Sequence, residues 1–251
     1  DRIKGDTLYY GAEVLGVASS GKFAPFWLQS NRNGNISASP YSGNLSAGVY
    51  KPATQPCRWF DYDFAVQMTG RVQSNILTVF SPYQKQITGY FNHLYAHVRL
   101  YFVDITAGIK PINYETIDPL LSSGSLILSG NSQPIPRVTI GIEDYIPFPG
   151  AFGYVELKGG MTYGWLADDV YIQNCRLHHK FAALRFGGKL PVNLSYEFHH
   201  AAEWGGISPV YGEVGSDFKS FLNVLMAHAG GTMANDQNNA QGNHVGSQQL
   251  A

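Results

Sequence analysis

The chain has 251 residues and a net charge of −1, with 17 Lys and Arg against 18 Asp and Glu. This balance gives no long-range electrostatic field that would attract nucleic acid or an acidic membrane surface. Charged residues make up only 14% of the sequence, whereas a typical soluble domain has roughly 25%. A surface poor in charge and rich in Tyr, Phe and Gly suits a protein whose outer wall meets lipid and whose inner wall is polar.

Apolar and polar residues alternate along much of the chain, which is the pattern of β-strands with two unlike faces. In chain order the alternating segments are 44–50, 60–73, 90–103, 137–143, 152–165 and 192–201. Three of them are 14 residues long, whereas strands in globular proteins most often have about 5–6. Aromatic residues gather at their ends, as in the girdles of membrane barrels. The sequence therefore predicts an all-β fold of long antiparallel strands.

The segment 152–165 has two unlike faces, and the predicted function depends on which of them faces the outside of the protein. Val155, Leu157 and Met161 share one face of this strand, and Glu156 and Lys158 share the other. In a soluble protein the charged face meets water, whereas in a membrane barrel the apolar face meets lipid and the charges line a lumen. We expect a transmembrane β-barrel, with a soluble sandwich or propeller as the alternative. Leu157→Arg should then cost about 2–4 kcal/mol near the bilayer midplane, while Lys158→Ala should be mild.

The segment 217–229 has helical rather than strand periodicity, and two glycines follow it as a stop. Its apolar side comprises Phe218, Phe221, Leu222, Leu225 and Met226. A helix of this length is too short to cross a bilayer. We therefore expect a plug, or a cap packed on the end of the barrel.

Two adjacent histidine pairs, His178-His179 and His199-His200, are the first candidates for metal chemistry. Adjacent residues of a strand point to opposite faces, so neither pair can chelate one ion. Glu197 and His199 do share a face, which leaves a metal site completed by another strand as an alternative to hydrogen bonding within the lumen. We expect no metal and no cofactor.

The carboxylate pair Asp61 and Asp63 has the spacing of some glycosidase acid–base pairs, about 6–7 Å by strand rise. Every pair of carboxylates two residues apart in a strand has this spacing, so a solvated lumen face is the simpler interpretation. The sequence contains no nucleophile elbow, phosphate loop or HExxH motif. We therefore expect a protein that is not an enzyme.

Charged and imidazole side chains interleaved with tyrosine form the predicted lumen face. Aromatic rings stack on sugar faces, and charged groups bind hydroxyls and uronate carboxylates. The candidate ligand-binding residues are Arg71, His93, His97, Arg99, Glu156, Lys158, Glu197 and His199. The alternative is that these charges simply satisfy one another across the sheet.

The two cysteines, Cys57 and Cys175, form neither a disulfide framework nor a zinc-binding spacing. One bridge between them in an oxidising compartment and two unpaired thiols are both compatible with the sequence.

Two long segments carry more specific information, LSSGSLILSGNSQPIPRVTIGIEDYIPFP (121–149) and LHHKFAALRFGGKLPVNLSYEFHHAAEWGGISP (177–209). Three shorter ones are PFWLQSNRNG (25–34), FGYVELKGGMTYGW (152–165) and NAQGNHVGS (239–247). Together, in this order, they resemble the capsule-assembly Wzi family in the form found in Bacteroidetes. The resemblance covers nearly the whole chain.

This resemblance implies a single barrel domain over 1–251 in the bacterial outer membrane, with short helical elements. It implies a non-catalytic protein that binds or anchors capsular polysaccharide at the cell surface. Its expected partners are this polysaccharide, outer-membrane lipid and the capsule export machinery, and we expect a monomer. Family members continue with further strands, so we expect the chain to be an incomplete part of a larger barrel. The alternatives are a porin-like diffusion channel and a soluble carbohydrate-active β-protein.

Overall fold

The computed structural model describes residues 7–54, 59–74, 86–111, 130–166, 172–209, 212–227 and 244–250. The chain forms two compact units, Asp1–Val98 with Gly108–Pro134, and Arg99–Ala107 with Ile135–Ala251. No helix in the described ranges is long and apolar enough to cross a membrane. Cys175 is a buried free thiol, and Cys57 lies outside the described residues.

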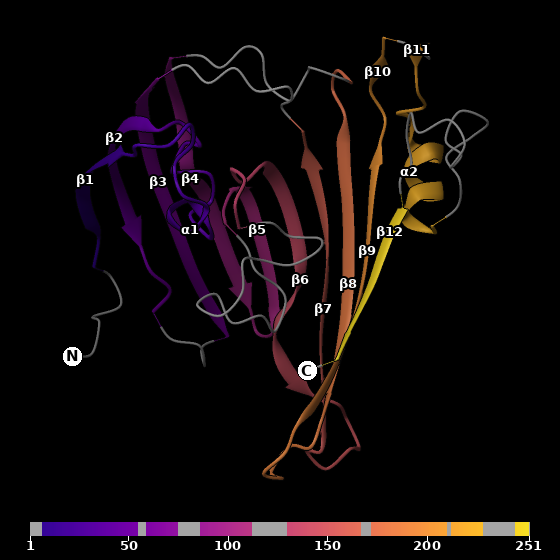
Figure 1. The fold of residues 1–251 in the computed structure, drawn as a ribbon. Coiled ribbons are helices and arrows are strands. Elements are labelled where there is room, and N and C mark those ends of the chain that lie inside the picture. Colours follow the sequence, from indigo (N-terminus) through magenta and orange to yellow (C-terminus); the bar gives the residue numbers. More distant parts are fainter. Residues whose placement is uncertain are drawn as a thin grey trace. The chain divides into compact units, whose positions relative to one another are not determined.

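In the first unit, three strands and most of a fourth follow one another across the sheet in chain order (Figure 1). They are β1 (Tyr9–Ala18), β2 (Tyr41–Lys51), β3 (Phe60–Gln73) and β4 (Ile87–Leu100), and helix α1 (Phe26–Gln29) lies between β1 and β2 in the chain. β2 pairs antiparallel with both β1 and β3. After α1, Gly34 has a φ of 67°, and a Cβ there would lie 2.8 Å from the backbone nitrogen of Gln133. Glycine fits this left-handed, crowded position because it has no side chain.

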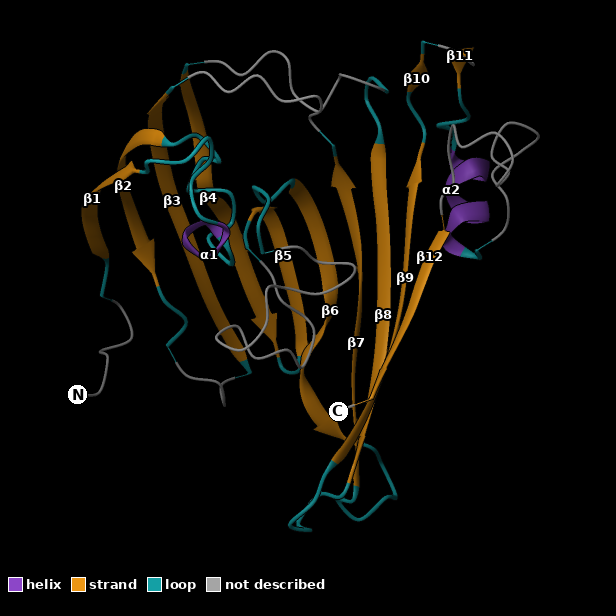
Figure 2. Ribbon diagram, in the orientation of Figure 1, coloured by secondary structure: helices purple, strands orange, loops and turns teal. Residues whose placement is uncertain are grey.

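The second unit contains most of β5 and all later elements (Figure 2). The sheet order is β5-β6-β7-β8-β9-β12. Its strands are β5 (Val103–Ile109), β6 (Pro136–Pro147), β7 (Val155–Trp165), β8 (Arg176–Phe186), β9 (Leu194–Trp204) and β12 (His244–Leu250). A separate two-stranded piece, β10 (Ile207–Ser208) with β11 (Gly212–Glu213), precedes helix α2 (Phe218–Leu225). The prediction of an all-β, antiparallel fold with a short helix is confirmed.

The sequence predicts that the chain is an incomplete part of a larger barrel, and the pairing of the two edge strands shows whether the described sheet closes. Among the described residues, β1 pairs with β2 alone and β12 pairs with β9 alone. A barrel requires its first and last strands to meet in register. The described sheet is therefore not closed into a barrel.

Several strand boundaries differ from those predicted by alternation. The segment 90–103 divides into two strands, because Tyr101 adopts a left-handed φ of 55° between β4 and β5. The segment 152–165 becomes a strand only at Val155, since Phe152 has a φ of 52° in the preceding turn. Turn geometry overrides the alternation at both places.

The burial of the two faces of β2 and β3 is reversed relative to a soluble protein. Polar side chains on one face are buried: Asn44, Ser46, Asp61, Asp63 and Thr69. Apolar side chains on the other face are exposed: Leu45, Tyr62, Val66, Met68 and Val72. The contrast is large, since Thr69 is 0% exposed and Leu45 is 61% exposed.

The second unit has the same reversal. Its buried polar residues on β6 to β9 include Arg137, Thr139, Lys158, Thr162, His179, Ser195, Glu197 and His199. Its exposed apolar residues on these strands include Val138, Ile140, Leu184, Phe186, Leu194 and Phe198. We refer to these two sides as the polar face and the apolar face.

Helix α2 covers one end of the apolar face. Val224 belongs to a buried cluster with Ala202 and Trp204 of β9, and Phe221 and Tyr163 pack against this cluster. The prediction of a cap at the end of the strands agrees with this position. The prediction of a plug is wrong, because α2 packs on the apolar face and not on the polar one.

Candidate functional site

The polar face of β7, β8 and β9 brings four of the predicted ligand-binding residues together. The strand register aligns Lys158, Ala183 and Glu197 in one row across the three strands. Neighbouring strands are about 4.8 Å apart, so Lys158 must cross β8 to reach Glu197. It does so over the small side chain of Ala183, and Lys158 Nζ lies 2.9 Å from Glu197 Oε1.

Glu197 is the centre of this network. Tyr145 Oη donates to Glu197 Oε1 at 3.3 Å, and His199 Nε2 lies 3.4 Å from Glu197 Oε2. The side chain of Glu197 is 2% exposed and that of Lys158 9% exposed. A buried carboxylate of this kind is stable only when it is paired and hydrogen-bonded.

A second histidine extends the network by one hydrogen bond. His179 Nε2 and His199 Nδ1 lie 3.1 Å apart, and the two rings stack at 5.4 Å. When His199 donates from Nε2 to Glu197, its Nδ1 is the acceptor in the neutral ring, and His179 is then the donor. With this tautomer the bonds run in one direction, from His179 through His199 to Glu197.

Packing fixes the orientation of these rings. The ring of Phe181 stacks on both His179 and His199. Gly160 lies opposite Phe181 in the register, and a Cβ on Gly160 would lie 3.0 Å from Phe181 Cε1. Glycine at this position thus gives the aromatic ring the room that it occupies.

One edge of the network is open to solvent. Arg185 Nε donates to Glu156 Oε2 at 2.6 Å, and the side chains are 36% and 19% exposed respectively. The Arg185 guanidinium lies 4.3 Å from the centre of the Tyr145 ring. We call Tyr145, Glu156 and Arg185 the open rim.

The chemistry of the buried part favours an ion-pair network over a metal centre. The Lys158 ammonium occupies a position next to the carboxylate where a metal ion would have to bind, and both ring nitrogens of His199 already have partners. The open rim differs, because its guanidinium and carboxylate are partly exposed and can exchange their mutual bond for bonds to hydroxyl or carboxylate groups.

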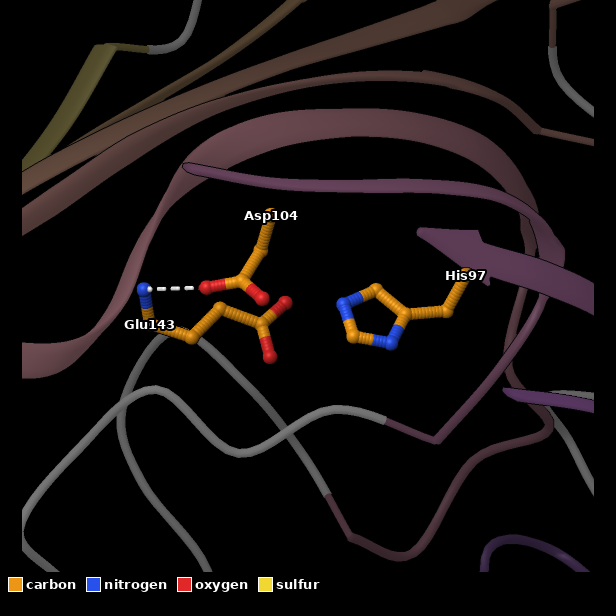
Figure 3. Close-up of side chains that lie close together, drawn as sticks. All are labelled: His97, Asp104 and Glu143. Carbon is orange, nitrogen blue, oxygen red and sulfur yellow. Dashed lines mark hydrogen bonds between the residues drawn. The ribbon is translucent and has the colours of Figure 1, made fainter. Parts of the chain in front are cut away.

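Arg99 also belongs to the second unit, but it forms ion pairs that are separate from the network around Glu197. Its Nε is 2.6 Å from Asp104 Oδ1, and its Nη1 is 2.8 Å from Asp144 Oδ2. Asp104 Oδ2 in turn accepts the backbone N–H of Glu143 at 3.1 Å (Figure 3). Arg99 therefore neutralises Asp104 and joins it to Asp144 of β6 within the second unit.

The remaining predicted residues lie in the first unit. Arg71 donates to the carbonyl of Gly34 and to the hydroxyl of Tyr90. His97 pairs with Asp63, whose other oxygen lies 3.6 Å from Lys110 Nζ. His93 lines a hollow of about 420 Å³ on β1 to β4, whose other lining residues include Glu13, Tyr50, Gln67 and Tyr95.

The sequence did not identify Tyr145, His179 or Arg185 as members of the site. Arg185 and His179 lie on β8, whose sequence RLHHKFAALRF alternates poorly. The missing information was the pairing of β8 with β9. This pairing places His179 opposite Ala201 and Arg185 opposite Ser195. The prediction that adjacent histidines face opposite sides does agree with the structure, because His199 and His179 lie on the polar face and His178 packs against Phe221.

Comparison with known proteins gave no relative from which a function could be transferred. No protein-family model matches the chain, and neither a curated protein nor a solved structure is significantly similar to it.

Proposed function

We propose that this chain forms the wall of an outer-membrane β-barrel that binds or anchors capsular polysaccharide without catalysing a reaction. The observation that carries the proposal is the reversed burial of the two sheet faces in both units. A soluble monomer rarely exposes a contiguous apolar patch above about 300–600 Å². Surrounding lipid explains long strands whose apolar side is exposed and whose polar side is buried.

The free energy of the exposed side chains supports a lipid environment. Moving a Leu or Phe side chain from water to an apolar environment is favourable by about 1.5–3 kcal/mol. Leu184, Phe186 and Phe198 all lie exposed on the apolar face of β8 and β9. In a bilayer this unfavourable exposure to water is removed, and the polar network on the other face keeps its hydrogen bonds away from hydrocarbon.

Barrel closure is a further part of the proposal. An open sheet edge within hydrocarbon leaves backbone N–H and C=O groups without partners, which is strongly unfavourable. Among the described residues, β1 pairs only with β2 and β12 only with β9, and their other edges would therefore pair with each other or with additional strands.

The open rim supports polysaccharide as the ligand. Arg185 can donate several hydrogen bonds to sugar hydroxyls or to a uronate carboxylate, and Glu156 can accept from hydroxyls. Both residues lie in segments that carry the resemblance to the Wzi family, 152–165 and 177–209. The buried residues Lys158, Glu197 and His199 then stabilise the wall and do not contact the sugar.

The membrane part is tested by refolding the purified protein into phospholipid vesicles. A folded barrel is expected to resist carbonate extraction and to migrate faster on a gel before heating than after it. A protein that remains soluble, monomeric and folded without detergent or lipid would contradict the proposal and would support the soluble β-protein instead.

The ligand is tested by titrating the detergent-solubilised protein with capsular polysaccharide purified from its own bacterium. Charge-assisted hydrogen bonds contribute about 1.5–3 kcal/mol, so Arg185→Gln should weaken binding by about tenfold or more. Lys189→Gln is the matched control, because Lys189 is exposed in the turn after β8. If the folded protein shows no saturable binding, the polysaccharide role is wrong, and conductance in planar bilayers then tests the diffusion channel.

A further inference from the structure

Helix α2 packs against Ala202 and Trp204 on the apolar face of the sheet, and Figure 1 shows it beside the end of β9 that carries these residues. The register aligns Tyr163, His178 and Ala202 in one row beneath the helix. Phe221 of the helix contacts the His178 ring edge-on, with the ring centres 6.2 Å apart. The next row contains Lys180 and His200. The helix thus covers two rows of strand residues that include polar side chains.

Two cations of β8 hold the helix at its ends. Arg176 Nη1 donates to the carbonyl of Ser216 at 2.8 Å, just before the helix begins. Lys180 Nζ donates to the carbonyl of Leu225, at the helix C-terminus. Four residues of strand and nine residues of helix both span about 13 Å, so α2 runs alongside β8.

A neighbouring side of the helix is apolar and exposed. Phe218, Leu222 and Met226 are spaced four residues apart and form one stripe. Phe218 is 73% exposed and Met226 is 64% exposed. On the same side of the sheet, Leu184, Phe186 and Phe198 of β8 and β9 are exposed as well. The stripe and the apolar face are therefore on the same side of the sheet.

We infer that α2 is an interfacial helix, with the stripe Phe218, Leu222 and Met226 inserted into the headgroup region of one membrane leaflet. This inference rests on the proposed function, because it takes the exposed apolar face to be the lipid-contacting face. Its occupant is phospholipid, since a helix with one apolar stripe lies with that stripe about 5–10 Å into the boundary between headgroups and acyl chains.

The polar residues beneath the helix support this location. A charged or imidazole side chain exposed to hydrocarbon is unfavourable, and α2 covers His178 while its carbonyl accepts from Lys180. Further along the same strands, towards Leu184 and Phe198, the face is apolar and uncovered. The helix thus coincides with the end of the apolar band, which is where the hydrocarbon would end.

The experiment uses single cysteines labelled with the fluorophore NBD in a Cys57→Ser, Cys175→Ser background. Phe218→Cys and Met226→Cys report on the stripe, and Phe198→Cys reports on the apolar face. Lys189→Cys, in the exposed turn after β8, is the aqueous control. Each labelled protein is refolded into vesicles of phosphatidylcholine brominated either near the headgroup or deep in the acyl chains, and heat-modifiable gel migration confirms folding.

The stripe probes are expected to lose fluorescence most strongly with the shallow bromines, the Phe198 probe with the deep ones, and the Lys189 probe with neither. Quenching at Phe198 without quenching at Phe218 and Met226 would overturn the inference and leave the proposed function intact. Quenching at none of these three positions in a folded protein would overturn both. Phe218, Leu222 and Met226 are exposed, and the gel migration of each labelled protein shows whether its fold is kept.

Discussion

Lys158 on β7 and Glu197 on β9 form an ion pair across the intervening strand β8, with Nζ and Oε1 2.9 Å apart. The pair exists because Ala183, which lies between them in the register, is too small to block it. Both charges are nearly removed from solvent. The stability of the sheet therefore depends on Lys158, although the sequence predicts only a mild effect of Lys158→Ala.

Removing one member of this pair should be strongly destabilising. Lys158→Met or Glu197→Gln alone should lower the free energy of unfolding by about 3–5 kcal/mol, because each leaves an uncompensated buried charge. The double variant should be less destabilised than the sum of the two single ones. Urea unfolding in vesicles, followed by tryptophan fluorescence, measures all three. Additive effects would show that the two groups do not interact.

Enlarging the residue between the two charges should have a related effect. Ala183→Leu should destabilise the fold by about 1–3 kcal/mol, because the added side chain overpacks the row that Lys158 crosses. Ala182→Leu is the matched control, since Ala182 is exposed on the apolar face of the same strand. Equal unfolding free energies for the two variants would contradict the geometry described for the polar face.

An arginine on the apolar face distinguishes lipid from water. Leu184→Arg should reduce the free energy of unfolding in vesicles by about 2–4 kcal/mol if position 184 lies near the bilayer midplane. If Leu184 is exposed to water instead, the same change should alter the free energy of unfolding by no more than about 0.5 kcal/mol. Leu184→Ala controls for the lost side chain. A small effect of the arginine would argue against lipid at this face.

Cys175 should be unreactive in the folded protein. Burial, together with the negative charge of Glu203, raises the pKa of the Cys175 thiol to about 11 from its ordinary 9.0. Little thiolate is then present at pH 8, and the thiolate is the form that reacts. In a Cys57→Ser variant, iodoacetamide should label Cys175 slowly until the protein is unfolded. Labelling of the folded protein at the rate of a free thiol would contradict this environment.

The same thiol makes a pH-dependent contribution to stability. Because the folded pKa is raised, the contribution is fully present below the unfolded pKa near 9.0 and is lost as the pH rises towards about 11. Between these values, Cys57→Ser should lose stability with rising pH more steeply than the double variant Cys57→Ser, Cys175→Ser. Parallel pH profiles of the two variants would show that the raised pKa has no effect on folding.

Alternation alone predicted the strand content and the two unlike faces, because side chains of a strand point alternately to its two sides whatever surrounds them. It did not predict where the strands turn or where their regular alternation is interrupted. Asn92 donates to Thr69, and His97 pairs with Asp63, although positions 92 and 97 should lie on opposite faces of a regular strand. A local irregularity in β4 must bring both to β3, and a strict period of two cannot reveal it.

By itself, the sequence determined that long β-strands would carry polar residues on one face and apolar residues on the other, and that 217–229 would contain a helix. Only the tertiary structure decided which side chains meet. Register places Lys158, Ala183 and Glu197 in one row, joins His179 to His199 and lays α2 on the apolar face. The physical reason is that pairing between strands depends on hydrogen bonds and turns distant in the chain, whereas alternation is a property of each strand alone.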